Sequence, residues 1–235
     1  RGPGMTGERR ESGNEGFRSP ETGDALQRMS DFHLDVLREV SNIGAGNAAT
    51  SLSTLLGKTV DMRVSRVFPM PFNEIIEYVG GAERMILSVF VRIEGGISGN
   101  MLFVMSREDA QSLVRHMTGA TETEEQGFSE MGLSVLHEVG NIMIGSYITA
   151  LSDFLGFELS PSVPSLAMDM AGAILAFSLS EIGRSGDTAI VIDGALSLDG
   201  GALSGNGAGH IFLLPDPESF NKIFQALGVA GNGDH

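Results

Sequence analysis

The sequence predicts a single α+β domain with two similar halves, each made of a helix, a set of strands and a second helix. The two long helices are expected to pack on one shared, mostly antiparallel sheet. Three observations predict this arrangement. Helical apolar spacing begins near residues 31 and 130, glycine-punctuated β-rich runs follow each helix, and the same residues recur 99 positions apart.

The first long helix is predicted from apolar residues at mixed three- and four-residue spacing. These residues are Phe32, Leu34, Val36, Leu37, Val40 and Ile43. Such spacing places side chains on one face of a helix, whereas a strand would alternate every second residue. Ser30 is a suitable N-cap and Gly57 a suitable end, so we expect the helix to run between them.

The second long helix repeats the first. Residues 31–60 align without a gap to residues 130–159, and thirteen of the thirty positions are identical, whereas chance would match two or three. Such agreement indicates an internal duplication. The identical pairs are Leu34/Leu133, Val36/Val135, Leu37/Leu136, Glu39/Glu138, Val40/Val139, Asn42/Asn141, Ile43/Ile142, Gly46/Gly145, Thr50/Thr149, Leu52/Leu151, Ser53/Ser152, Leu56/Leu155 and Gly57/Gly156.

The strands are predicted after each long helix, at residues 60–67, 85–94 and 99–105 and again at 165–176, 189–198 and 209–214. Each half should close with a short helix. Ser106 and Asp109 form a capping box before a helix at 110–117. Pro217 suits the first turn of a helix that continues through 220–227.

The domain is expected to span residues 28–228, with halves at about 28–120 and 127–228. Residues 1–27 are polar and predict a disordered tail, in which residues 1–4 resemble a vector remnant before Met5. An acidic surface loop should join the halves, and residues 229–235 form a second tail.

Charge and composition exclude several classes of function. The net charge of −15 argues against a nucleic-acid binder, and the absence of cysteine excludes disulfides and thiolate chemistry. The sequence contains no apolar run of about 18 residues, which a membrane span would require. We expect a cytoplasmic protein. Lys58 and Lys222 are the only lysines. An acidic excess with few lysines fits a high-salt habitat, although an ordinary acidic protein has the same composition.

The candidate functional residues are two Glu-x-x-Asn pairs, Glu39 with Asn42 and Glu138 with Asn141. Three-residue spacing places both polar groups of a pair on one helix face. A single pair of this kind usually lies on a solvated helix face without a function. Here the pair is duplicated among the shared apolar residues that pack each helix, and this favours a function. The shared Gly46 and Gly145 are interpreted as sites of close helix packing. The histidines show no metal-ligand spacing, so no metal site is expected.

The segments around these pairs resemble the CheC phosphatases of chemotaxis. The similar stretches are EVSNIGAGNAA at 39–49, EVGNIMIGSY at 138–147 and LSDFLGF at 151–157, and the likeness extends over about residues 30–228. CheX and the FliY and FliM middle domains are relatives of that family. One departure is Ser146 in the place of Asn47, which puts a shared role of that position in doubt.

The resemblance implies a phosphatase that hydrolyses the phospho-aspartate of the response regulator CheY. Asn42 and Asn141 would orient the attacking water, and Glu39 and Glu138 would engage a lysine of the regulator. The regulator would supply Mg²⁺, so no cofactor of its own is expected. The resemblance also implies a second partner, the receptor deamidase CheD.

Two further points stay open at the level of sequence. Asp169 is a candidate for the CheD-facing region, although an aspartate on a strand surface needs no function. The alternative to a phosphatase is a non-catalytic CheD adaptor or a flagellar-switch module that docks the regulator without hydrolysis. Retention of both Glu-x-x-Asn pairs favours the enzyme.

Overall fold

The computed structural model describes residues 31–119, 127–182, 188–199, 201–202 and 209–228, with no side-chain detail at 177–182 and 201–202. Both predicted tails, Ser30 and most of the predicted linker lie outside this range. The elements in chain order are α2 (Asp31–Leu56), β1 (Val60–Pro71), η1 (Phe72–Glu74), α3 (Ile75–Tyr78), β2 (Met85–Gly95), β3 (Gly99–Ser106), α4 (Arg107–Thr118), α5 (Glu130–Leu155), β4 (Leu159–Pro161), β5 (Ser165–Met170), α6 (Ala171–Ile182), β6 (Thr188–Leu198), β7 (Gly201–Ala202), β8 (Gly209–Pro215) and α7 (Pro217–Ala226).

The strands form one antiparallel sheet of eight strands in the order β1-β6-β8-β3-β2-β4, in which β5 also pairs with β2 and β7 with β6. Strands from the two halves of the sequence are interleaved. The first-half strand β1 lies beside β6 of the second half, and β8 lies beside β3. The predicted α+β class with a shared antiparallel sheet is therefore confirmed.

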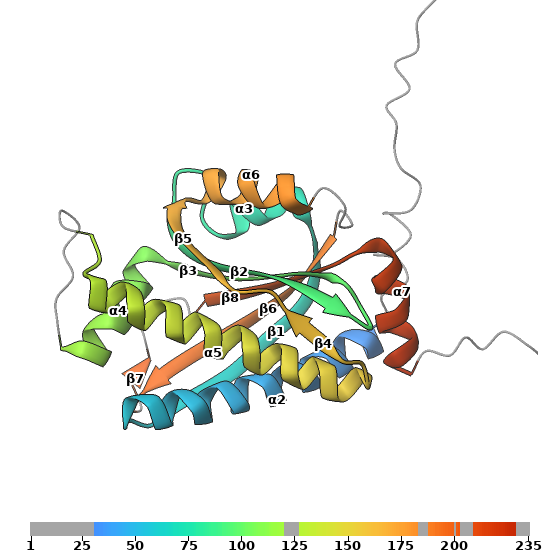
Figure 1. Cartoon of the computed structure of the whole chain (residues 1–235), viewed down its shortest axis with the longest axis horizontal. Coiled ribbons are helices and arrows are strands. Elements are labelled where there is room, and N and C mark those ends of the chain that lie inside the picture. Colours follow the sequence, from blue (N-terminus) through green and yellow to red (C-terminus); the bar gives the residue numbers. More distant parts are fainter. Residues whose placement is uncertain (1–30, 120–126, 183–187, 200, 203–208, 229–235) are drawn as a thin grey trace, which may run out of the picture.

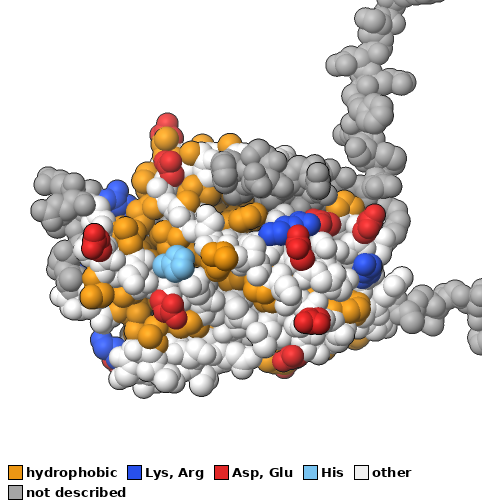
Figure 2. Space-filling model, in the orientation of Figure 1, with side chains coloured by type: hydrophobic (Ala, Val, Ile, Leu, Met, Phe, Trp, Pro, Cys, Tyr) orange, Lys and Arg blue, Asp and Glu red, His pale blue; other side chains and the backbone are white. Residues whose placement is uncertain are grey.

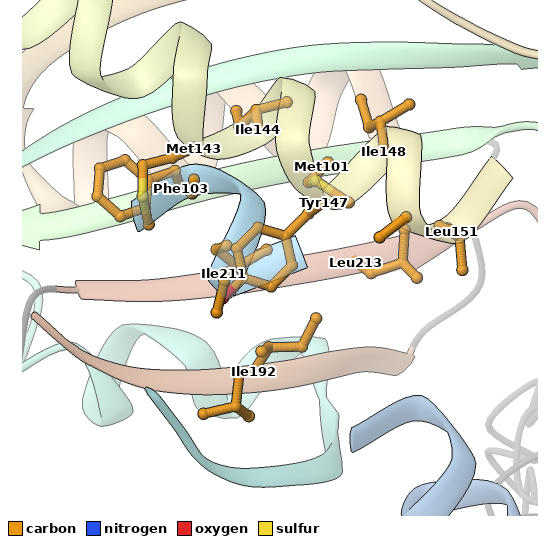
Figure 3. Close-up of a cluster of buried hydrophobic side chains, with 14 of the residues drawn as sticks. Met101, Phe103, Met143, Ile144, Tyr147, Ile148, Leu151, Ile192, Ile211 and Leu213 are labelled. Atoms are coloured by element: carbon orange, nitrogen blue, oxygen red, sulfur yellow. The ribbon is translucent and has the colours of Figure 1, made fainter. Parts of the chain in front are cut away.

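Helices α2 and α5 lie side by side on one face of the sheet and run in opposite directions, while α3 and α6 cover the other face (Figure 1). The core under the long helices is apolar, and Figure 3 shows how Met143, Tyr147 and Leu151 of α5 point toward Ile211 and Leu213 of β8. Full burial of such a side chain contributes about 1.5–3 kcal/mol. A smaller apolar cluster lies under α3 and α6.

The predicted ends of the long helices agree with the structure. Gly57 and Gly156 follow the last turns with φ of 60° and 68°, a left-handed conformation that glycine adopts without steric cost. The Ser106 hydroxyl accepts a hydrogen bond from the Asp109 N–H at 3.1 Å and begins α4 as the capping pattern predicted. Pro217 occupies the first turn of α7.

One predicted strand is wrong in its second half. The run 165–176 was expected to be β-rich, but β5 ends at Met170 and the chain continues as α6. The buried residues Ala171, Ile174 and Leu175 follow helical spacing, and alanine is the best helix former. The sequence analysis also missed η1, α3 and the short strand β4.

Candidate functional site

The two Glu-x-x-Asn pairs occupy equivalent places on the long helices, α2 and α5. The side chains of Glu39, Asn42 and Glu138 are exposed, and Asn141 is half-buried. The apolar residues that follow the two glutamates, Val40 and Val139, are buried, with 3% of each side chain exposed. Each helix therefore seats an apolar face on the sheet and turns its glutamate outward, and Asn42 is exposed beside Glu39 whereas Asn141 is only partly exposed.

The first pair lies beside the edge strand β1. The Asn42 Oδ1 accepts a hydrogen bond from the Val64 N–H at 3.3 Å. The strand pairing with β6 shifts register between Val64 and Arg66, so Ser65 forms a bulge next to this contact. Bulges bend a strand and turn backbone groups away from the ladder, which explains how a strand N–H becomes available to a helix side chain.

An open groove of about 440 Å³ lies between the N-terminal half of α2 and strand β1, and neither Glu39 nor Asn42 is among its lining residues. Asp35 and Arg38 line its helix side, and Arg66 and Phe68 line its strand side. Asn42 lies one helical turn after Arg38, so the groove leads along the helix toward the amide.

A polar network on the other face of the sheet holds the bulged part of β1 in place. Asp193 of β6 accepts hydrogen bonds from Arg66 at 2.7 Å and from Tyr78 at 2.6 Å, and His210 Nδ1 lies 2.8 Å from its second oxygen. Burial alone would raise the pKa of Asp193, but these hydrogen bonds outweigh it and lower that pKa to about 2. The Ser65 hydroxyl also donates to the Asp193 carbonyl at 3.2 Å.

The second pair has a different environment. The Asn141 Nδ2 lies 3.3 Å from His137 Nδ1, one turn earlier on the same helix, and the amide donates there when that ring nitrogen carries no proton. The Asn141 Oδ1 is buried and accepts no hydrogen bond from any residue that the structure describes. This contact was not predicted, because the histidines were assessed only for metal-ligand spacing, although the four-residue spacing of His137 from Asn141 was the available signal.

A groove of about 490 Å³ borders the second pair and runs between the two long helices. Thr50 and Ser51 line it from α2, and Asn141, Gly145 and Thr149 line it from α5. The first pair faces a strand edge, whereas the second faces the partner helix.

The two carboxylates of the pairs have no partner within the described ranges. Neither Glu39 nor Glu138 accepts a hydrogen bond or forms an ion pair with a described residue. On the face shown in Figure 2, most acidic side chains are scattered among neutral and apolar ones, and one basic group lies against acidic neighbours. Both carboxylates are therefore available to a cation that arrives on another molecule.

The interpretation of Gly46 and Gly145 as packing residues is wrong. A Cβ added to either glycine would meet no atom within 4 Å. The glycines that packing requires are Gly44, where a Cβ would lie 3.1 Å from the Tyr147 Cα, and Gly140, where it would lie 2.4 Å from the Val89 Cγ2. Those close approaches depend on the tertiary structure and leave no local signal.

Comparison with known proteins assigns the chain to a family. The family model described as CheC-like matches residues 32–64 and 131–168, which contain both Glu-x-x-Asn pairs. The CheY-P phosphatase CheC of Bacillus subtilis (strain 168) is 40% identical over 204 residues, which cover 86% of this chain and 97% of that protein. This chain belongs to the CheC-like family.

Solved structures share the fold of this CheC-like chain. Thermotoga maritima FliY matches with a TM-score of 0.66 and 20% identity, over 87% of this chain and 100% of that one. The FliM middle domain from H. pylori matches with a TM-score of 0.58 and 12% identity, over 84% and 99% of the two chains. At these identities the likeness establishes the shared architecture alone.

Asp169 lies apart from both pairs of the CheC-like chain. It is exposed on β5, and its Oδ1 accepts a hydrogen bond from the Met170 N–H at 2.7 Å. Together with Val163 and Ile174 it lines a groove of about 680 Å³ beside α6. The structure therefore separates Asp169 from the residues predicted for catalysis.

The described residues of the CheC-like chain lack two further features, a metal-binding cluster and a membrane-spanning helix. They contain no group of three or more His, Asp or Glu side chains that could hold a metal ion. No helix among them is both long enough and apolar enough to cross a membrane.

Proposed function

We propose that this chain is a phosphatase that hydrolyses the phospho-aspartate of a CheY-type response regulator. The observation that carries the proposal is the pair of outward-facing Glu-x-x-Asn motifs on equivalent helices. They occur in a chain that is 40% identical to a CheY-P phosphatase over nearly all of that protein's length. Family membership supports the reaction, and the exposure of Glu39, Asn42 and Glu138 supports their part in it.

The chemistry requires little from the phosphatase. An aspartyl phosphate is an activated acyl phosphate, and the regulator supplies Mg²⁺ and a lysine to its own phosphoryl group. What is missing is a water molecule held in line with phosphorus, and an amide holds one well because it offers a donor and an acceptor. A hundredfold acceleration requires about 2.7 kcal/mol, which is within the reach of one positioned water and one charge contact.

The asparagines are the groups assigned to that water. The Asn42 Oδ1 has a second lone pair beside its bond to Val64, and the Asn42 Nδ2 has no hydrogen bond to a described residue. An amide held at its carbonyl loses less side-chain entropy when it binds water, since its torsions are already restricted. Asn141 is held instead through Nδ2 by His137.

Glu39 and Glu138 are assigned to docking rather than to proton transfer. Each lies one turn before its asparagine on the same helix face, and each lacks a partner within the described structure. A carboxylate in this position attracts the lysine of the regulator and brings the amide to the phosphoryl group. The phosphatase then needs no metal or organic cofactor of its own, because the Mg²⁺ belongs to the regulator.

Regulation by CheD is the part of the proposal that rests on the family resemblance. Asp169 is its candidate contact, because it is exposed on β5 beside a groove that is separate from both catalytic pairs. Contact there would leave both pairs open to the regulator. We place the protein in the cytoplasm, where its regulator acts.

The second candidate is a module that docks the regulator or CheD without hydrolysis. The fold shared with the FliM middle domain favours it, because the same architecture serves a flagellar-switch protein. Fold alone does not decide function.

The deciding experiment measures decay of phosphorylated CheY with Mg²⁺, with and without the full-length chain. The wild-type protein should accelerate phosphate release, and the double variant Asn42→Ala with Asn141→Ala should remove about hundredfold of the acceleration while folding normally. Thr54→Ala serves as a control on the same helix. Binding of the regulator without any acceleration by the wild-type protein would favour the docking module.

A further inference from the structure

Gly46 and Gly145 are glycines that the fold does not require. Both lie inside 26-residue helices, and a Cβ at either position would meet nothing within 4 Å. Both have ordinary helical backbone, without the positive φ of Gly57 and Gly156. Alanine at such a position favours folding by about fivefold in the equilibrium constant, because glycine loses more backbone entropy.

Both glycines hold the same position relative to the catalytic pair. Glu39, Asn42, Gly46 and Thr50 are spaced by three, four and four residues and therefore follow one stripe of the helix. The stripe recurs as Glu138, Asn141, Gly145 and Thr149 with identical residues. The Ile43 side chain stands beside the first stripe and is 50% exposed, so it adds apolar surface next to the stripe.

The packing glycines behave in the opposite way. Gly44 and Gly140 are each required by a close neighbour within the fold, yet neither is shared between the copies. The residue equivalent to Gly44 is Met143, and the residue equivalent to Gly140 is Ser41. Packing therefore explains the glycines that the copies do not share and leaves the shared pair unexplained.

We propose that Gly46 and Gly145 are the points of close approach between each helix and the docked response regulator. This inference rests on the proposed phosphatase function. Without a Cβ, the helix presents bare backbone one turn after each asparagine, and the polypeptide that carries the phospho-aspartate passes over it. A methyl group there holds the partner away, and a misplacement of about 1 Å at a reacting centre can cost about a hundredfold in rate.

The test compares Gly46→Ala, Gly145→Ala and the double variant with the wild-type chain and with Thr54→Ala. Thr54 is an exposed α2 residue twelve positions, or about 18 Å, beyond Asn42, and its change also raises helix propensity. Each variant is assayed for thermal unfolding, for kcat and KM with phosphorylated CheY, and for binding to beryllofluoride-activated CheY.

The double variant should melt at a higher temperature than the wild type and yet lose at least about tenfold in kcat/KM, mainly through a higher KM. With two equal sites, each single variant should lose at most about half of kcat/KM because the other site still works, and Thr54→Ala should gain stability without losing activity. A double variant that binds activated CheY as tightly as the wild type would overturn the inference, as would a lower melting temperature, which would indicate a packing role. Failure of the close-approach inference can be told apart from failure of the proposed function. In the second case, the wild-type protein itself does not accelerate the decay of phosphorylated CheY, whatever the binding measurement gives.

Discussion

The two copies of the Glu-x-x-Asn pair have the same residues on equivalent helices, but the fold holds their amides in different ways. Asn42 is fixed at its carbonyl by the N–H of Val64, a residue of another element at the edge of the sheet. Asn141 is held at its nitrogen by His137 of its own helix, and its buried carbonyl has no partner within the described structure. Duplication preserved the motif and left its supports free to diverge.

The way each amide is held therefore depends on residues that differ between the two copies. The position equivalent to His137 is Arg38 in the first copy, and the described structure has no hydrogen bond between Arg38 and Asn42. An unpaired buried amide oxygen costs about 1–3 kcal/mol. Within the described residues, Asn141 therefore carries a buried, unmet hydrogen-bonding capacity that Asn42 does not have.

The largest expected effect separates the two copies directly. Asn42→Ala and Asn141→Ala, made singly, should each remove one working site and leave the activity of the other, while the double variant loses about hundredfold. This loss corresponds to about 2.7 kcal/mol of barrier. Steady-state phosphate release from phosphorylated CheY provides the measurement. If one single variant already abolishes the acceleration, the other copy is not an independent site.

The next effect tests whether strand β1 supports the first copy alone. Asp193→Asn should destabilise the fold by about 2 kcal/mol at pH 7, because the charged carboxylate binds Arg66, Tyr78 and His210. It should also lower the activity that remains in an Asn141→Ala background more than the activity that remains in an Asn42→Ala background. Equal losses of activity in both backgrounds would show that the Asp193 network does not specifically support the first pair.

The same network predicts a dependence of stability on pH. The pKa of Asp193 is lowered to about 2 in the folded state. A lowered pKa contributes stability that is fully present above the unfolded value near 4 and is lost as the pH falls toward 2. The free energy of unfolding, measured in urea, should therefore fall less between pH 5 and pH 2 for Asp193→Asn than for the wild type.

A smaller effect concerns the support of the second copy. His137→Phe removes the acceptor for the Asn141 amide but keeps an aromatic side chain, and it should lower the activity of the second site by about threefold. The variant is measured in an Asn42→Ala background, with Arg38→Ala in an Asn141→Ala background as the matched control. A similar loss in the control would mean that both positions contribute only to surface charge.

The smallest effect is global and should leave the ratio of the two sites unchanged. With a net charge of −15, raising NaCl from low to molar concentration should screen repulsion and raise the melting temperature by a few degrees. Scanning calorimetry at several salt concentrations measures this. A flat or falling melting temperature would remove the argument for a high-salt habitat.

The features that could be predicted from the sequence depend on residues that lie close together along the chain or recur at a fixed spacing. The apolar periods gave both long helices, the repeated identities gave the two-fold relation, and Gly57 and Ser106 marked helix ends. The outward direction of Glu39 and Asn42 also followed from their offset to Val40 and Leu37.

What could not be predicted depends on partners far apart in the chain. The network of Arg66, Tyr78, Asp193 and His210 spans most of the sequence. Gly46 was assigned to packing and Gly44 was given no role, because only the tertiary structure shows that Gly44 meets Tyr147 and that Gly46 meets nothing. The roles of Glu39, Asn42, Glu138, Asn141 and Asp169 stay predictions that the experiments above address.

The interleaved order of the strands bears on how such a molecule arose. Because β1 needs β6 and β3 needs β8, a half chain would leave several strand edges open and could close them only against a second identical half. The unfused ancestor was in that case an obligate homodimer with one asparagine per subunit. Fusion of the two genes then released each copy from the demand of symmetry and allowed the two sites to specialise.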